Sequence, residues 1–216
     1  MTEPLTRAEQ KQQTRDAIMT AAVRKMNDDR GFSSLSLREV AKEAGIAPPS
    51  FYRHFDNMEA LALALVKEAG DALLKIASDT RVQEEKGENV LEGTVAVCME
   101  HFRQNGPLFR VLAREATGNS PIIRRAIQRV LNDLNKQLAK VIELEMKKRG
   151  RKITDAAWIA EAIITLVFYI GVSNSDLPYA RQKDAEKRLV HHIRALYWGA
   201  EAMASSLHLE RQLMLY

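Results

Sequence analysis

Residues 35–55 read LSLREVAKEAGIAPPSFYRHF, and this stretch decides the fold. Ser36 and Glu39 have the spacing of a capping box, in which the serine oxygen accepts an amide hydrogen and the glutamate reaches back to the start of the helix. The box predicts a short helix, which Gly45 ends because glycine adopts a positive φ without a steric penalty. The stretch therefore begins with one short helix and a tight turn.

A second short helix follows the turn. Pro48 and Pro49 fit only the first turn of a helix, because neither residue has an amide hydrogen to donate. Ala41 is small enough for the two helices to pack closely, over a shared apolar seam of Val40, Ala44, Ile46 and Phe51. This is the pattern of a helix-turn-helix, whose second helix enters the major groove of DNA. The alternative is a helical hairpin that only packs within the protein.

The rest of the chain also predicts helices. Its 216 residues include only 10 Gly and 6 Pro, and no run alternates polar and β-branched residues. Caps and breakers divide it into further segments at about 6–27, 56–85, 88–104, 107–116, 121–149, 154–173 and 179–206. With the two short helices this makes nine. The expected fold is all-α, with a three-helix helix-turn-helix head over residues 8–57 and a larger helical ligand-binding and dimerisation domain over residues 58–216.

Composition excludes several classes of protein. The single Cys rules out a disulfide framework, and 46% apolar with 28% charged residues is typical of a soluble globular chain. Residues 1–15 are polar and lack the apolar core of a secretory signal. The longest apolar run, 162–172, is shorter than the about 20 residues that span a membrane. We therefore expect this run to be a buried helix and the protein to be cytoplasmic.

No pattern indicates an enzyme, a metal site or a cofactor. The chain has no Gly-rich phosphate loop, no nucleophile elbow and no pair of catalytic carboxylates. His191 and His192 are adjacent, but no carboxylate or third histidine lies at ligand spacing. Cys98 lies on the apolar face of its helix, which favours a buried, inert thiol over a redox sensor. We therefore expect a binding protein.

The net charge of +4 is unevenly distributed. Residues 1–60 carry 9 basic and 9 acidic side chains, whereas residues 121–150 carry 8 basic and 3 acidic ones. The excess of positive charge therefore lies outside the helix-turn-helix, on a predicted helix whose other face is apolar. A DNA-binding role must rest on the geometry of the motif rather than on overall charge.

Residues 35–41 (LSLREVA), 44–46 (AGI) and 51–55 (FYRHF) together resemble the DNA-binding head of the TetR family of bacterial repressors. The resemblance covers about residues 10–60 without a gap. It implies a homodimer in which each head reads one half of a palindromic operator in double-stranded DNA. It also implies that the remaining helices hold a ligand pocket and that the last two long helices pair with their copies.

The resemblance assigns roles in the head by position. Tyr52 and His54 match residues that contact phosphates, and Ser36 matches the helix start that meets the DNA backbone. Base-edge or sugar contacts fall to Ala47, Pro48, Pro49 and Ser50. Met58 is a departure, because many members of the family have a phosphate-binding Lys there. Phosphate anchoring is therefore expected from helix-start amides near Asn57 and from Lys11, Arg15 and Arg53.

Residues 30–32 (RGF), residues 52–55 (YRHF) without a following Lys, and residues 109–115, which begin Phe-Arg and end Arg-Glu, look like the FabR and DesT subgroup. Its members regulate unsaturated fatty-acid synthesis and sense acyl-CoA or acyl-carrier-protein thioesters. This resemblance implies a long-chain acyl-CoA as effector, with a direction of effect that the sequence leaves open. The alternatives are a repressor that senses drugs or other hydrophobic compounds, and a helical acyl-CoA-binding carrier or enzyme.

An acyl chain needs an apolar tunnel with polar anchors at its mouth. The candidate lining residues are Met99, Phe102, Phe109, Leu112, Trp158, Phe168 and Tyr169, for which core packing is the alternative. The helix at 156–172 is apolar on nearly all sides, so we expect it to contact protein or ligand all round.

Basic residues provide candidate anchors for the head group of such an effector. Arg114 lies among apolar residues, so its charge needs a partner, either Glu115 or a ligand. Arg125 and Arg129 are four residues apart, with Arg124 beside them, and are candidates for binding the phosphates of coenzyme A. The alternative is a solvated basic face.

The last long helix carries features of a dimer interface. It has an apolar stripe, and small residues at 195, 199 and 202 would let two helices approach closely. Two-fold symmetry would place the two heads about 34–36 Å apart, which is one turn of DNA.

Overall fold

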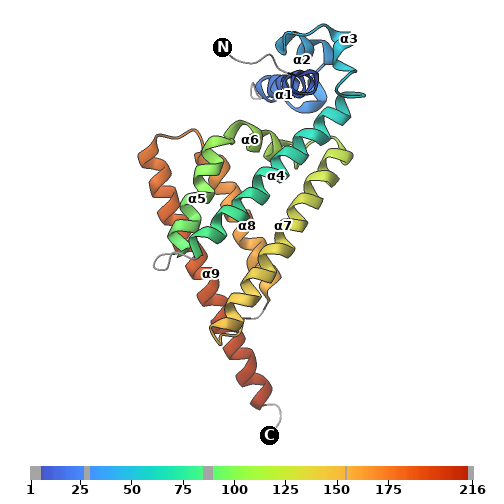
Figure 1. Ribbon diagram of the computed structural model, residues 1–216. Coiled ribbons are helices and arrows are strands. Elements are labelled where there is room, and N and C mark those ends of the chain that lie inside the picture. The colour runs from blue at the N-terminus through green and yellow to red at the C-terminus, as the bar shows by residue number, and fades with distance from the viewer. Residues whose placement is uncertain (1–5, 27–29, 85–89, 154, 214–216) are drawn as a thin grey trace. The chain divides into compact units, whose positions relative to one another are not determined.

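The computed structural model describes residues 6–26, 30–84, 90–153 and 155–213 (Figure 1). Over these ranges the chain forms nine α-helices, a short 3-10 helix at Phe32–Ser34 and no strand, which confirms the predicted all-α fold. The helices are α1 (Arg7–Met26), α2 (Leu37–Glu43), α3 (Pro48–Phe51), α4 (Met58–Glu84), α5 (Val90–Gln104), α6 (Gly106–Glu115), α7 (Pro121–Lys148), α8 (Ala156–Asn174) and α9 (Tyr179–Leu213). Most bounds agree with the predicted segments, but α3 is shorter and α9 is longer.

Side-chain caps begin several helices where the sequence predicts them. Before α1, the Thr6 amide donates to Glu9 Oε2 at 2.7 Å and the Glu9 amide donates to Thr6 Oγ1 at 3.3 Å. Asp155 caps α8 in the same way, through amides of its first turn. The start of α4 differs from the prediction, because Asn57 rather than Asp56 is the cap. Asn57 Oδ1 accepts the amide three residues further on at 2.8 Å, so the motif begins one residue later.

The chain divides by packing into two compact units. The head unit comprises Met1–Ala72 and Pro107–Arg129, and the body unit comprises Leu73–Gly106 and Val130–Tyr216. The head unit thus includes nearly all of α6 and the first turns of α7, in addition to the predicted helix-turn-helix. The functional boundary between residues 57 and 58 remains a prediction, since it concerns DNA binding rather than packing.

The head unit has its own apolar core. In it α1 packs against α2, and α2 against α3. The core side chains come from α1 to α4 and from α6, and include Ile18, Ala22, Met26, Val40, Phe51, Leu61, Leu65 and Phe109, all of them buried. The two short helices are therefore held by a core to which residues far along the chain contribute.

The body unit is built around α5, α8 and α9, which all pack against one another. Its core also takes Ala139, Ile142 and Met146 from the second part of α7. Gly171 on α8 leaves room for the ring of Phe102. A Cβ atom at Gly171 would lie 2.4 Å from Phe102 Cγ, far closer than packed carbon atoms come. The aromatic ring therefore packs directly on the backbone of α8.

The most apolar helix is only partly covered by its own chain. Among the described residues, α8 alone is long and apolar enough to cross a membrane, and 33% of its most apolar window is buried. Trp158 and Tyr169 are 67% and 70% exposed. The single chain therefore leaves one stripe of α8 open, so the expectation that its own chain buries this helix is wrong there. The expected contact of that stripe with a partner or a ligand stays a prediction.

Candidate nucleic-acid interface and effector site

The turn between α2 and α3 has the geometry that the sequence predicts. Gly45 has a φ of 69°. The Gly45 amide donates to the Lys42 carbonyl at 3.2 Å and the Ile46 amide donates to the Ala41 carbonyl at 3.0 Å, which is a Schellman motif. Ala47 then caps α3 in an extended conformation, with Pro48 and Pro49 as its first helical residues. The turn is thus fixed by local hydrogen bonds, and α3 leaves it at a defined angle.

The predicted DNA-contacting residues of α3 and its start lie on the surface. Phe51 is fully buried and anchors the helix in the core, whereas Tyr52 is 61% exposed. The residues predicted for base-edge or sugar contacts are exposed at Ala47, Pro48 and Pro49 and half-buried at Ser50. The α-helix ends at Phe51, and residues 52–55 continue as turns, with the His54 amide bound to the Phe51 carbonyl at 2.9 Å. The reading surface is therefore a single helical turn followed by a tight, hydrogen-bonded corner.

Basic residues from α1 and from the turn after α3 gather around His54. The Arg15 guanidinium donates to the His54 carbonyl at 2.7 Å and lies 4.1 Å from the centre of the Phe55 ring. Burial lowers the pKa of His54, and the positive charges of Lys11, Arg15 and Arg53 lower it further. The Nδ1 atom of His54 is buried and makes no hydrogen bond to any described residue. This corner gathers positive charge beside α3 although residues 1–60 carry no net charge, and such a corner suits phosphate.

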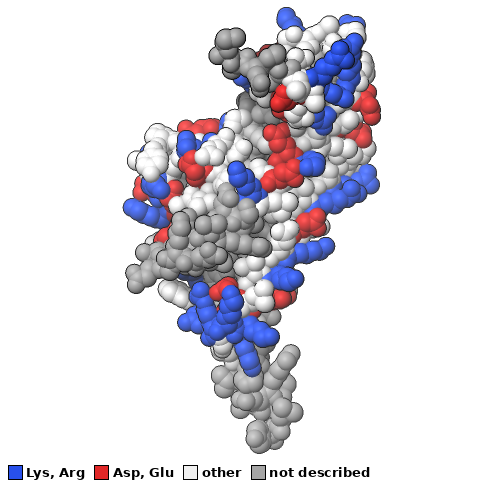
Figure 2. Space-filling model, in the orientation of Figure 1, with Lys and Arg blue, Asp and Glu red and all other residues white. Residues whose placement is uncertain are grey.

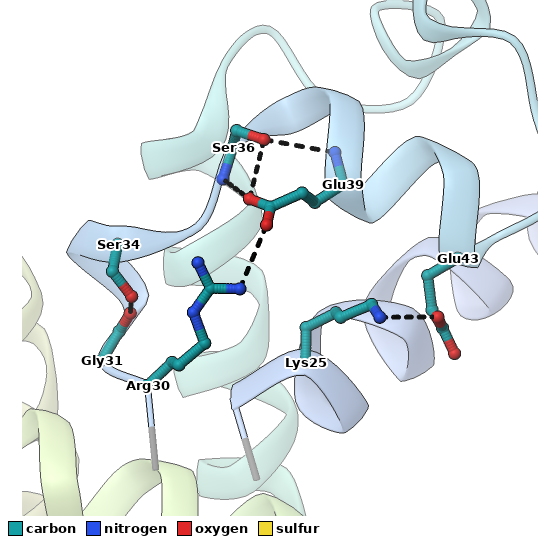
Figure 3. A network of polar contacts seen from close by, with 7 residues as sticks. All are labelled: Lys25, Arg30, Gly31, Ser34, Ser36, Glu39 and Glu43. Carbon is teal, nitrogen blue, oxygen red and sulfur yellow. Dashed lines mark hydrogen bonds and ion pairs between the residues drawn. The ribbon is translucent and has the colours of Figure 1, made fainter. Parts of the chain in front are cut away.

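Ser36 lies in a network at the start of α2 (Figure 3). Its hydroxyl donates to Glu39 Oε2 at 2.8 Å, and its oxygen accepts the Glu39 amide at 3.2 Å. Glu39 also accepts from the Arg30 guanidinium at 3.0 Å. The backbone amide and hydroxyl of Ser36, and then Arg30, lower the pKa of Glu39 to about 2. Ser36 is exposed, but its hydroxyl is bound within the start of α2. A second ion pair, between Lys25 of α1 and Glu43 at 3.1 Å, lies at the other end of α2.

The predicted effector-lining residues do not form one group. Phe109 and Leu112 are buried in the head unit, and Met99 and Phe102 in the body unit. The rings of Phe102 and Phe168 meet edge to face at 5.8 Å. A cavity that Leu112 lines in the head unit holds only about 10 Å³, which is too small for an acyl chain. Trp158 and Tyr169, as described above, face outward.

Arg114 finds its partners within the protein. Its guanidinium donates to the carbonyl of Met26 at 2.6 Å and to that of Arg30 at 3.0 Å. The sequence offered Glu115 or a ligand as partner, but the structure pairs Arg114 with backbone oxygens more than 80 residues away. A close pairing of this kind was invisible in the sequence, because nothing near Arg114 in the chain signals it.

Basic side chains follow the length of α7 in a row (Figure 2). At its start a surface hollow is lined by Ala116, Pro121, Arg124, Arg125 and Gln128. Arg124 donates to the Gly118 carbonyl, and Arg125 Nε donates to the Pro121 carbonyl at 3.1 Å. Arg129 is exposed. Two of the three predicted arginines therefore line one hollow, and their other guanidinium hydrogens remain for solvent or an anion.

Asn135 and Cys98 are two further polar residues with buried side-chain atoms. Asn135 Oδ1 on α7 is buried without a hydrogen-bond partner among the described residues. The signal was a single amide between Leu134 and Leu138 on an otherwise apolar face, which the sequence analysis passed over. Burial raises the pKa of Cys98 to about 12, so its thiol stays protonated and unreactive at neutral pH.

Known bacterial regulators match most of the chain. A family model described as "Bacterial regulatory proteins, tetR family" matches residues 18–65. A second, described as "Tetracyclin repressor-like, C-terminal domain", matches residues 87–196. The first match covers the helix-turn-helix with Arg53 and His54 but not Lys11 and Arg15. The second begins just before α5 and ends within α9.

Solved structures share the fold at low sequence identity. A putative TetR-family regulator from Syntrophomonas wolfei is 19% identical, with a TM-score of 0.69 over 86% of this chain and 95% of that one. The fatty acid degradation regulator FadR from Bacillus halodurans is 22% identical, with a TM-score of 0.64 over 82% and 94%. FadR from Thermus thermophilus, a TetR-family repressor solved in complex with lauroyl-CoA, is 20% identical, with a TM-score of 0.57 over 85% and 93%. At these identities the likeness concerns the fold.

Proposed function

Because the chain belongs to the TetR family of bacterial regulatory proteins, we propose that it is a cytoplasmic repressor that binds a palindromic operator as a homodimer and responds to a long-chain acyl thioester. Its family makes it a DNA-binding transcriptional regulator. The observation that carries the DNA-binding surface is the positive corner around His54, directly beside the exposed turn of α3.

The proposed contacts divide into two classes. Ala47, Pro48, Pro49 and Ser50 meet base edges and sugars in the major groove, because they lie at the exposed start of α3. Tyr52, Arg53, His54, Lys11 and Ser36 meet phosphates on either side. Arg15 acts mainly by holding the His54 carbonyl and the Phe55 ring, since its guanidinium is committed there.

Operator binding is tested by fluorescence anisotropy with the palindrome in the upstream region of this protein's own gene. We expect affinity to fall steeply with salt, because bound phosphates release counterions. Arg53→Ala should weaken binding to all sequences. It should reduce the slope of log K against log salt by about 0.9 per head, or about 1.8 for the dimer, because each subunit loses one phosphate contact. The control Lys67→Ala, which removes an exposed α4 side chain paired with Asp71, should leave the slope unchanged. Absence of binding at low salt would contradict the proposal.

The dimer interface is proposed on the open stripes of α8 and α9. On α8 Trp158, Thr165 and Tyr169 recur at helical spacing on the exposed side, and on α9 Trp198 is 68% exposed beside Gly199. Exposed aromatic side chains beside small residues are typical of surfaces that a second subunit covers. Trp158 and Tyr169 therefore serve the dimer better than a tunnel within one chain.

The acyl-thioester effector is supported by the sequence resemblance to the FabR and DesT subgroup and by the lauroyl-CoA bound to the Thermus relative. Met99, Phe102 and Phe168, all in the body unit, are the proposed contacts of the acyl chain. Arg125 and Arg129 are proposed to bind the phosphates of coenzyme A. The regulated genes would then serve unsaturated fatty-acid synthesis.

The effector proposal is tested by titrating oleoyl-CoA and oleate separately. Arg125→Ala/Arg129→Ala should weaken oleoyl-CoA binding about tenfold and leave oleate unaffected, because only the thioester carries phosphates. The matched control is Lys136→Ala/Lys140→Ala, which removes two exposed cations from later turns of the same helix. Equal losses in both double variants would indicate a general effect of positive charge rather than a binding site.

Mass spectrometry of compounds extracted from the purified protein then identifies the effector. A drug-like compound would favour the alternative, a repressor that senses drugs or other hydrophobic compounds.

A further inference from the structure

We propose that Arg114 and Glu115, at the end of α6, are positioning residues for the helix-turn-helix and carry the effector signal to it. The second half of this inference rests on the proposed function. Both residues lie outside the part of the chain that the TetR helix-turn-helix model matches, residues 18–65, and inside the part matched by the C-terminal domain, residues 87–196. By packing, however, they belong to the head unit.

Arg114 holds the end of α1. Its guanidinium bridges the carbonyl of Met26, the last residue of α1, and the carbonyl of Arg30. A cation at the C-terminal end of a helix compensates the carbonyl groups that have no partner within the helix. The bridge therefore binds the last residue of α1 and Arg30 through one guanidinium.

Glu115 holds the next turn of the same segment. Its side chain is buried, and Oε1 accepts the amide of Phe32 at 2.8 Å. Phe32 is itself buried and begins the 3-10 helix that leads to α2. A buried carboxylate needs hydrogen-bond donors, so this bond is costly to lose. The two neighbouring residues of α6 thus grip both sides of the connection between α1 and α2.

The connection continues from this segment into the helix-turn-helix (Figure 3). The carbonyl of Arg30 accepts from Arg114, while its guanidinium binds Glu39, and Glu39 forms the capping box with Ser36. The capping box begins α2, which packs against α3. A displacement of α6 is therefore passed through hydrogen bonds to the element that positions the recognition helix.

Arg114 and Glu115 with their partners are also connected to α7 by hydrogen bonds. Arg124 binds the carbonyl of Gly118, and the Gly118 amide donates to the Glu115 carbonyl at 3.1 Å. A Cβ atom at Gly118 would lie 2.8 Å from Glu115 Oε2 and 3.3 Å from Glu115 Cα, so only glycine leaves space for the carboxylate. Along the chain α6 follows α5 of the body unit after one residue, and α7 returns to that unit. The chain thus connects the head-unit residues Arg114 and Glu115 to the body unit on both sides.

The test uses one pair of glycine variants on opposite sides of the carboxylate. Gly118→Ala should displace Glu115. Gly31→Ala is the matched control, because its Cβ would lie 3.5 Å from Glu115 Oε1, an ordinary contact, and its φ of −73° suits alanine. Glu115→Ala removes the carboxylate directly, and Glu115→Gln retains an acceptor for the Phe32 amide.

We expect Gly118→Ala and Glu115→Ala to weaken operator affinity about tenfold and to accelerate hydrogen exchange at the Phe32 amide. Gly31→Ala should stay within about twofold of the native protein, and Glu115→Gln should recover part of the loss. In Gly118→Ala and Glu115→Ala, affinity for oleoyl-CoA should stay within about twofold of the native value. In the same variants oleoyl-CoA should no longer change operator affinity, because binding and coupling are separate quantities.

Native operator affinity and native Phe32 exchange in both Gly118→Ala and Glu115→Ala would overturn the inference. So would an equal loss in Gly31→Ala, which would indicate general damage to the turn. If the native protein binds its operator and ignores oleoyl-CoA, the effector proposal fails, whereas the positioning role is still decided by exchange and operator affinity. A native protein that binds no operator would sink the proposed function, and exchange at Phe32 would then decide the positioning role alone.

Discussion

Glu39 is bound at once by its own helix start and by Arg30, and its acidity follows from those bonds. The amide and hydroxyl of Ser36 both donate to its carboxylate, so the ionised form is stabilised over the protonated form. The capping box of Ser36 and Glu39 can be predicted from their spacing in the sequence. The ion pair between Arg30 and Glu39, nine residues apart, is visible only in the structure.

We predict that the Glu39 carboxyl titrates near pH 2 in the folded protein, against an ordinary value of 4.5. Because folding depresses its pKa, its contribution to stability is complete above pH 4.5 and is lost as the pH falls toward 2. Carboxyl-carbon NMR of the native protein and of Ser36→Ala measures this, and the variant should titrate closer to 4.5. Ser34→Ala is the control, since that hydroxyl binds the Gly31 carbonyl. A native midpoint near 4.5 would refute the prediction.

His54 provides a second prediction at this scale. Burial and three nearby cations lower its pKa in the free protein, and a bound phosphate would oppose those cations and raise it. Operator binding should therefore take up a proton and grow tighter as the pH falls below about 6.5. Calorimetry in buffers of different ionisation enthalpy measures the uptake, and His54→Gln should abolish it. The exposed α9 residue His192, changed to Gln, is the control, and equal uptake in native and His54→Gln proteins would count against the idea.

Among the elements, α2 and the start of α3 behave as the sequence predicts, because their limits are decided by hydrogen bonds between residues a few positions apart. The Schellman motif at Gly45 and the proline start of α3 need no distant partner. The helix α8 behaves otherwise. Its composition predicts burial on every side, yet one stripe stays open in the single chain, because coverage depends on what packs against it.

Gly171 yields a prediction for α8. Replacing it by Val places two methyl groups where the Phe102 ring lies, so the ring or the helix must shift. Overpacking of this kind costs about 1–3 kcal/mol in the free energy of unfolding, measured by urea denaturation. Ala157→Val, on an exposed position of α8, should cost far less. Equal stability of the two variants would show that Phe102 does not pack on the α8 backbone.

At the scale of the whole molecule, surface and charge are divided between functions. Residues 1–60 are balanced in charge and gather cations around His54, whereas the basic row lies along α7. The open aromatic stripes of α8 and α9 lie in the body unit, which supports a dimer built by that unit and leaves the heads to the DNA.

Trp198→Arg tests that division. A charge on the proposed interface should be left unpaired in the dimer, so light scattering should report the mass of a single 24.4 kDa chain. Operator affinity should fall with it, because one head then reads one half-site. Leu144→Arg, at a 53% exposed position of α7, is the control and should remain dimeric. A dimeric Trp198→Arg protein would move the interface elsewhere.

The sequence by itself determined the all-α fold, the helix-turn-helix and the surface residues of α3. Those features depend on helical period, caps and turns, whose hydrogen bonds join residues a few positions apart. Only the tertiary structure decided that Trp158 and Tyr169 face outward and that Arg114 and Glu115 bind Met26, Arg30 and Phe32. Contacts between residues 83 or more positions apart arise from packing, because no local pattern selects one distant backbone group over another.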